Sequence, residues 1–164
     1  MKQGFVYLRP VELVGFRCRG PYAASAAKAW RLMFAWLERH GLRGPTDRGY
    51  GLAHDDPRVC APENCRYDAC VEVPDHLPAE AFEGLTKQRL PSGAYARKRH
   101  IGPHGDLSTV MREMRLTWSS RHGLELCRKR PALEIYLDDP KFVRPERLRT
   151  DICLPIAFSS ARTS

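Results

Sequence analysis

The stretch Trp36-Leu37-Glu38-Arg39-His40-Gly41-Leu42 returns 82 residues later (118 − 36 = 82) as Trp118-Ser119-Ser120-Arg121-His122-Gly123-Leu124. Other short matches keep this spacing to within one residue, namely Gly20-Pro21 with Gly102-Pro103 and Asp55-Asp56-Pro57 with Asp138-Asp139-Pro140. Self-similarity at a fixed period indicates a duplicated structural unit. The sequence therefore predicts two copies of one module, related by a pseudo-two-fold axis, with a groove where the copies meet.

Each copy has the hydrophobic pattern of a strand, a helix and two further strands. Strands show alternation of apolar residues and helices show apolar residues at helical spacing. The first copy is predicted to have strands at 11–19, 48–54 and 66–73 and a helix at 23–40. The second is predicted to have strands at 92–101, 132–138 and 150–156 and a helix at 106–122. One helix per module packed on an antiparallel sheet makes an α+β fold of duplicated βαββ modules.

The length of 164 residues fits a single domain. We expect this domain to cover residues 1–156, with repeat 1 at about 4–74 and repeat 2 at about 92–156. Residues 75–91 are predicted to form an ordered linker, and residues 157–164 a polar tail.

Composition narrows the classes of function. No apolar run approaches the ~20 residues that span a bilayer, and the first residues lack the pattern of a secretory signal, so we expect a cytoplasmic protein without a membrane partner. The formal net charge is +8, but the basic residues are scattered and no direct DNA-binding motif accompanies them.

The six cysteines lack the C-x2-C spacing of common zinc sites. We expect free thiols, no metal and no cofactor.

The two copies differ most in their third element. Glu134 in the second copy matches Gly51 in the first, and Tyr136 matches Ala53. Because side chains alternate along a strand, Glu134 and Tyr136 share one face. The pattern predicts an open space with an anionic wall. The alternative interpretation is an exposed glutamate on the wet face of the sheet.

Aromatic residues supply further candidates. Trp36 and Trp118 occupy matching positions late in the two predicted helices, where they are either core anchors or walls of the groove. Tyr22, at the start of the first predicted helix, aligns with His104. Tyr95 lies in the predicted strand 92–101, next to the basic run of that strand. We take Tyr22, Trp36, Tyr95, Trp118 and Tyr136, with Glu134, as candidate ligand-binding residues.

The order and spacing of several motifs resemble the GyrI-like small-molecule-binding domain family, in its stand-alone form. They are Ser92-Gly93-Ala94-Tyr95-Ala96, Gly102-Pro103, Trp118, Leu133-Glu134-Ile135-Tyr136, and the segment from Cys65 to Pro74. The family includes the bacterial DNA gyrase inhibitor protein and the effector-binding domains of AraC-type and MerR-type regulators. The resemblance covers roughly residues 4–156.

The resemblance implies a central ligand cleft with a glutamate, which maps onto Glu134, and aromatic walls, which map onto Trp118 and Tyr136. It implies binding of lipophilic, often cationic small molecules by a sensor, sequestrant, multidrug-binding or toxin-resistance protein. Two alternatives stay open. One is a hydrolase of cyclopropane-bearing or similarly strained electrophiles, with Glu134 as its catalytic residue. The other is an inhibitor that contacts DNA gyrase, or a transcription component, as a protein partner.

Overall fold

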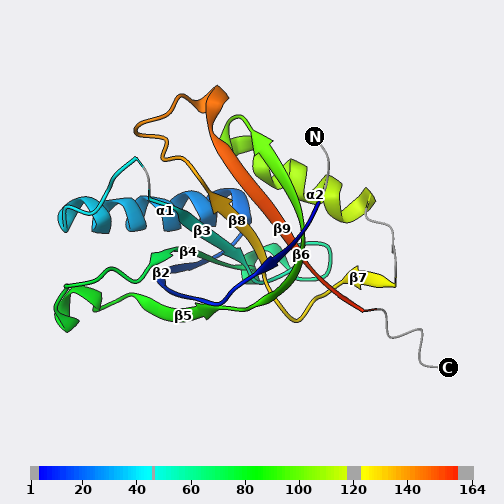
Figure 1. Ribbon diagram of the computed structural model, residues 1–164, viewed down its shortest axis with the longest axis horizontal. Helices are drawn as coiled ribbons and strands as arrows, with labels where there is room; N and C mark the ends of the chain where they lie inside the picture. The colour runs from blue at the N-terminus through cyan, green and yellow to red at the C-terminus, as the bar shows by residue number, and fades with distance from the viewer. Residues whose placement is uncertain (1–3, 46, 118–122, 159–164) are drawn as a thin grey trace.

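A computed structural model describes residues 4–45, 47–117 and 123–158. Within them, two helices lie on one face of a bent antiparallel sheet (Figure 1), which confirms the α+β prediction. The strands are β1 (Gly4–Leu8), β2 (Val11–Arg19), β3 (Gly49–Ala53), β4 (Arg66–Glu72), β5 (Thr86–Leu90), β6 (Gly93–Ile101), β7 (Leu124–Leu126), β8 (Ala132–Tyr136) and β9 (Arg149–Phe158). The helices are α1 (Tyr22–Arg39) and α2 (Leu107–Thr117), with 3₁₀ turns η1 (Pro62–Asn64), η2 (Ala79–Phe82), η3 (His104–Asp106) and η4 (Pro145–Arg147).

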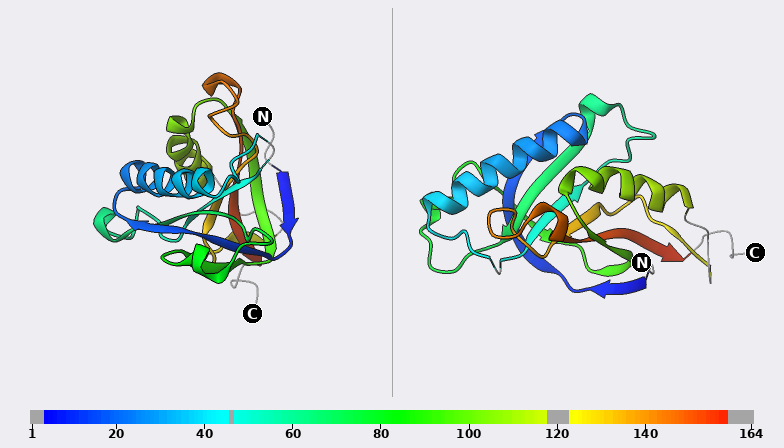
Figure 2. Two further views of the ribbon diagram at one scale, coloured as in Figure 1. Left: turned by 90° about the vertical axis from the view of Figure 1, so that its left-hand side faces the viewer. Right: turned by 90° about the horizontal axis from the view of Figure 1, so that it is seen from above.

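The strands run in the order β1-β6-β9-β8-β3-β4-β2-β5, and β7 pairs separately with β9. The sheet bends so that its two halves meet at an angle, with both helices on the inner side (Figure 2, left). Both repeats pair their strands in the same register: Leu13 opposes Glu72 in the first, and their repeat equivalents Tyr95 and Pro155 oppose each other in the second. The duplication predicted from the sequence is therefore present in the backbone.

Each repeat begins with a strand that the sequence pattern did not predict. These strands are β1 and β5, which keep the same 82-residue spacing (86 − 4 = 82). Each pairs with the second strand of the other repeat, β1 with β6 and β5 with β2. The segment expected to be a linker, 75–91, thus contains η2 and β5. The two repeats exchange their first strands.

The pseudo-two-fold axis passes between β3 and β8, the central pair of the sheet. Gly51 opposes Glu134 across this pair, and Gly51 is also the repeat equivalent of Glu134 (134 − 51 = 83). A residue that pairs with its own equivalent lies on the local axis. The two repeats therefore meet at this pair of positions.

Alternation along the central strands sorts residues onto the two faces as expected. Leu133 and Ile135 pack on the face away from the helices, with Leu13, Tyr50, Leu52 and Leu90. Tyr136 belongs to the cluster on the helix face, with Met33, Trp36 and Met111. Helix α1 ends within one residue of the predicted position, because Gly41 adopts φ 66° and Leu42 N donates to the Leu37 carbonyl at 2.8 Å.

The C-terminal boundary differs slightly from the expectation. Strand β9 continues through Ala157 to Phe158 because Leu124 and Glu125 of β7 pair with those two residues. The expected tail therefore begins two residues too early.

No helix in the described ranges is long and apolar enough to cross a membrane.

Candidate functional site

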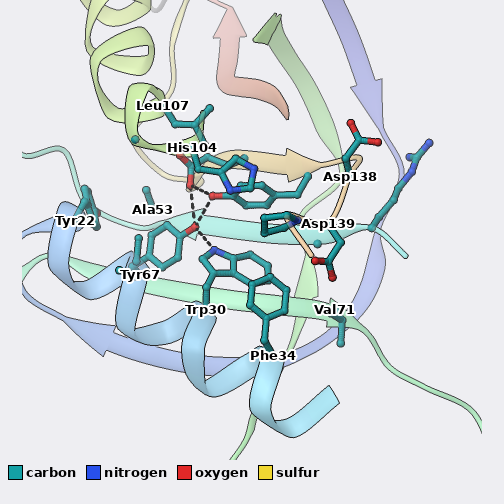
Figure 3. A pocket seen from close by; sticks show the side chains of 18 of the residues that line it. Tyr22, Trp30, Phe34, Ala53, Tyr67, Val71, His104, Leu107, Asp138 and Asp139 are labelled. Atoms are coloured by element: carbon teal, nitrogen blue, oxygen red, sulfur yellow. Dashed lines mark hydrogen bonds between the residues drawn. The ribbon is translucent and has the colours of Figure 1, made fainter. Parts of the chain in front are cut away.

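A cavity of about 340 Å³ lies on the helix face of the sheet, directly over the pseudo-two-fold axis. Side chains from α1, the start of α2, β3, β4 and β8 line it (Figure 3). Its apolar and aromatic lining includes Tyr22, Ala26, Trp30, Phe34, Leu37, Tyr67, Val71, Leu107, Met111 and Tyr136. Volumes of about 300–1,000 Å³ with mainly apolar walls are typical of small-molecule sites.

Glu134 is the central polar group of this cavity. Its Oε1 accepts hydrogen bonds from the Tyr67 hydroxyl at 2.8 Å and the Tyr136 hydroxyl at 2.9 Å. Trp30 Nε1 in turn donates to the Tyr67 hydroxyl at 2.9 Å (Figure 3). Both hydrogen bonds converge on Oε1, and none within the described residues reaches Oε2. The carboxyl therefore has one oxygen fixed by the protein and one available for another partner.

Burial governs the ionisation of this cluster. Only 7% of Glu134 is exposed. Removal from water raises the pKa of the Glu134 carboxyl above its ordinary value, while the hydrogen bonds from Tyr67 and Tyr136 act in the opposite direction. Burial, together with the neighbouring carboxylate, raises the pKa of both tyrosine hydroxyls well above the usual range. The tyrosines are therefore neutral hydrogen-bond donors at physiological pH.

Glu134 differs from the other buried acids of the fold. Asp68, Asp139 and Asp151 each form a bidentate ion pair with an arginine, Arg17, Arg43 and Arg99 respectively. Within the part of the chain that the structure describes, Glu134 has no cationic partner. A buried charge without a counterion is costly. Such a carboxyl indicates a functional site.

Two glycines of β3 allow the aromatic residues to approach the sheet. A Cβ atom at Gly51 would collide with the Tyr67 hydroxyl and lie 3.0 Å from Glu134 Oε1, and one at Gly49 would lie 2.7 Å from the Trp30 ring. The space predicted at Gly51 is therefore not open. It holds the hydrogen bond between Tyr67 and Glu134, and the cavity begins beyond this layer.

Charged residues surround one end of the cavity. Asp138, Asp139 and Pro140, which follow β8, line it together with Arg43, Gly44, Asp47 and Arg48, which precede β3. Arg43 holds Asp139 with two bonds of 2.9 Å and lies 3.9 Å from the centre of the Phe34 ring. A protein cation thus already occupies an aromatic face at this end.

The structure brings together three of the predicted site residues, Glu134, Tyr136 and Tyr22, which all line the cavity. Trp36 lies elsewhere: only 2% of it is exposed, its Nε1 donates to the Ala81 carbonyl at 2.9 Å, and it packs on Phe82. Tyr95 is buried on the opposite face of the sheet, beneath Arg130. Trp118 falls outside the described residues.

Sequence reasoning missed Trp30 and Tyr67, and it noted His104 only as the match of Tyr22. Trp30 belongs to the apolar stripe of α1, and Tyr67 follows the alternation of β4, so both have the pattern of ordinary core residues. The signal that could have found Tyr67 is the pair of small residues Gly51 and Ala53 in the neighbouring strand β3. Ala53 opposes Tyr67, and small residues beside a tyrosine leave room for its ring. All six cysteines are free, and no described group of three His, Cys, Asp or Glu could hold a metal ion.

Comparison with known proteins identifies relatives of the whole fold. The family model of the GyrI-like small molecule binding domain matches residues 1–157. The chain is 33% identical to the probable transcriptional regulator YgiV of Escherichia coli K12 over 150 residues, which cover 90% of each chain. It is 29% identical to the DNA gyrase inhibitor of Cronobacter sakazakii over 151 residues, covering 90% of this chain and 92% of that one.

Solved structures share the fold at lower identity. EcmrR in its complex with DNA has a TM-score of 0.72 and 17% identity, and the match covers 96% of this chain but only 57% of that one. SAV2435 bound to tetraphenylphosphonium has a TM-score of 0.61 and 15% identity, with 96% and 94% covered. These likenesses agree with the α+β architecture described above.

Proposed function

Because the chain belongs to the GyrI-like small molecule binding domain family, we propose that its cavity binds a flat or globular lipophilic cation. The observation that carries this proposal is Glu134, a buried carboxyl with two tyrosine donors and, among the described residues, no cation beside it. A ligand cation would supply the missing counterion. The aromatic walls would contribute cation–π attraction, each contact worth about 0.5–2 kcal/mol.

The geometry supports a binder with a defined order of contacts. Tyr67 and Tyr136 fix Oε1, and Trp30 and Phe34 present ring faces and edges at the cavity wall, with centroids 5.4 Å apart. A cation entering this space would meet Oε2 and aromatic surface together. The likeness to SAV2435, whose structure contains tetraphenylphosphonium, supports a ligand of this class. Such a protein would act as a sensor or a sequestrant.

A matched pair of ligands tests the proposal. Tetraphenylphosphonium and tetraphenylborate have nearly the same shape and opposite charges. The cation should raise the melting temperature of the wild type, because a ligand that binds only the native state stabilises it by mass action. The anion should not. Glu134→Gln, which is nearly isosteric, should lose most of the shift with the cation. Equal shifts with both ligands, or in both proteins, would remove charge recognition by Glu134 from the proposal.

Hydrolysis of a strained electrophile, such as a cyclopropane, is a second candidate function. It is supported by Oε2, which accepts no hydrogen bond from the described residues, and by the raised pKa of Glu134, since a carboxylate with these properties can accept a proton from a water. The water oxygen would bond to the electrophilic carbon as the strained C–C bond opens. The electron pair of that bond would pass to the departing carbon, which would then receive the proton held by Glu134. Glu134→Gln should then abolish product formation, measured by chromatography, while a neutral product analogue still binds.

Contact with DNA gyrase is a third candidate, supported by the likeness to the Cronobacter protein that is named a gyrase inhibitor. A supercoiling assay with purified gyrase tests it. Loss of supercoiling that depends on the concentration of this chain, and that persists in Glu134→Gln, would place the activity on the surface instead of in the cavity.

A further inference from the structure

The two ends of the cavity differ because one pair of equivalent residues differs. Tyr22 and His104 match across the repeats (104 − 22 = 82), and each stands at the entrance to its helix. Figure 3 shows Tyr22 at one end of the lining and Asp138 and Asp139 at the other, with His104 between them. The partner of Tyr22 in repeat 1 is Asp55, whose repeat equivalent is Asp138.

In repeat 1, Tyr22 is fastened at its end of the cavity by two hydrogen bonds. Its hydroxyl donates to the Asp55 carbonyl at 2.8 Å and accepts from Asp55 N at 2.9 Å. We call this double contact the Tyr22 latch. Asp56, the next residue, is held by Arg58 at 2.8 Å and by Arg115 of α2 at 3.3 Å. The segment beyond Tyr22 is therefore fastened both to the cavity wall and to the other repeat.

The latch divides two spaces. Asp55 and Asp56 do not line the main cavity, but they do line a smaller cavity of about 200 Å³ on the far side. The two cavities share Ala53 as a lining residue. In repeat 2, the equivalents Asp138 and Asp139 line the main cavity itself. The main cavity thus stops at the latch in repeat 1 and extends to the corresponding segment in repeat 2.

His104 makes no such latch. No hydrogen bond joins it to Asp138 among the described residues, and its ring meets the Tyr136 ring edge to face at 4.8 Å. Its Nε2 is buried without a hydrogen-bond partner within the described ranges. The imidazole is turned toward the centre of the cavity and does not bridge to the segment 138–140. The hydroxyl that Tyr22 contributes in repeat 1 therefore has no counterpart at position 104.

The segment 138–140 is itself fixed in place. Arg149 holds Asp138 with two bonds of 2.9 Å, and Arg43 holds Asp139 as described above. The opening therefore does not require this segment to move. We infer that ligands enter and leave the cavity between His104 and residues 138–140, and that the missing latch at His104 keeps this entrance open. This inference rests on the proposed function, since it concerns the route to the Glu134 site.

The pseudo-symmetry supplies the test. His104→Tyr should copy the Tyr22 latch onto Asp138, and His104→Phe is the matched control because it has the same ring without the hydroxyl. Association and dissociation of tetraphenylphosphonium would be followed by stopped-flow tryptophan fluorescence. His104→Tyr should slow both rate constants by about tenfold and leave the dissociation constant within about threefold, since a barrier on the route affects both directions. His104→Phe should keep the rate constants within about threefold of the wild type.

The exchanged variant adds an independent check. Combining His104→Tyr with Tyr22→His moves the open end to the other repeat, and it should restore rapid exchange. Unchanged rate constants in His104→Tyr, equal slowing in His104→Phe, or failure of the exchanged variant to restore the rates would overturn the inference. Absence of binding by the wild type would instead overturn the proposed function, so the two failures are distinguishable.

Discussion

Gly51 and Glu134 oppose each other across the central strand pair and are also equivalent positions of the two repeats. The carboxyl of the site therefore stands almost on the pseudo-two-fold axis, opposite a residue without a side chain. A symmetric pair of repeats would place the same residue at both positions. The difference between glycine and glutamate here places a carboxyl on one side of the axis only, and among the described acidic residues that line the cavity this is the one on the central strand pair.

Gly51→Ala should damage the site from the opposite strand. The new Cβ would collide with the Tyr67 hydroxyl and separate it from Glu134. We expect a loss of about 1–3 kcal/mol in the free energy of unfolding, measured by urea denaturation. Gly4→Ala is the matched control, because a Cβ there meets nothing within 4 Å. Equal effects of the two substitutions would contradict the close approach of Tyr67 to β3.

Tyr67→Phe should affect stability more than Tyr136→Phe. The Tyr67 hydroxyl donates to Glu134 and also accepts from Trp30 Nε1, so its removal leaves a buried donor without a partner. We expect a cost of about 1–3 kcal/mol in the free energy of unfolding for Tyr67→Phe. Tyr136→Phe removes a donor to Glu134 but leaves the Trp30 bond in place, and it should cost less. Calorimetry of both variants under one set of conditions checks the order.

The raised pKa of Glu134 makes stability depend on pH. Between the unfolded pKa of about 4.3 and the raised folded value, the native state binds more protons than the unfolded state. This contribution is fully present below the unfolded pKa and is lost as pH rises through the folded pKa. The free energy of unfolding of the wild type, measured relative to Glu134→Gln, should therefore fall with rising pH across this window. A difference that stays constant with pH would show that the carboxyl is not desolvated.

The affinity for a cation should follow the opposite trend. Only the ionised carboxylate attracts a cation, so the association constant for tetraphenylphosphonium should rise with pH through the same folded pKa. Titration calorimetry at several pH values would measure this rise. In Glu134→Gln the affinity should be low and independent of pH over that window.

The two tryptophans of α1 should separate binding from stability. Trp36→Phe removes the bond to the Ala81 carbonyl, which anchors η2, and should cost about 1–2 kcal/mol in the free energy of unfolding without changing ligand affinity. Trp30→Phe removes the bond to Tyr67 and part of the cavity wall, so it should weaken binding. A loss of affinity in Trp36→Phe would place that residue at the ligand after all.

Equivalent ion pairs of the two repeats should differ in strength. Asp68 accepts bonds from Arg17, His54 and Gln88, whereas its equivalent Asp151 is paired with Arg99. Burial opposes ionisation of Asp68, but these three partners outweigh it and lower its pKa below the ordinary value. Asp68→Asn should therefore cost about 3 kcal/mol in the free energy of unfolding, more than Asp151→Asn. The penalty for Asp68→Asn should shrink as pH falls below the unfolded pKa of about 3.9.

The duplication and the α+β fold could be predicted because both are local signals. Repeated motifs fix the correspondence between halves, and alternation fixes which strand residues face the helices. Strands β1 and β5 were missed because each lies at an edge of the sheet and pairs with a strand of the other repeat. Their formation depends on pairing across the repeats, which a local pattern does not record.

The site was only partly predictable for a related reason. Glu134 and Tyr136 stand out because their equivalents in the other repeat lack large side chains. Tyr67 and Trp30 have no such mark, since a residue in an apolar stripe is indistinguishable from core until the helix is placed over the sheet. Trp36 illustrates the converse: its equivalence to Trp118 left a core anchor and a wall of the groove both open, and the structure shows a buried residue that bonds to η2 and packs on Phe82.

The exchange of first strands has a consequence for cutting the chain. A break near Gly84, where the backbone adopts φ 83°, would leave β1 in one fragment and its partner β6 in the other, and likewise β5 and β2. Neither fragment could complete its own sheet. Two copies of the second fragment would bring two glutamates together at the axis, which like charges oppose, whereas one copy of each fragment restores Gly51 opposite Glu134. We therefore expect the two fragments to be complementary, since only one copy of each restores both exchanged strand pairs and the lining of the cavity.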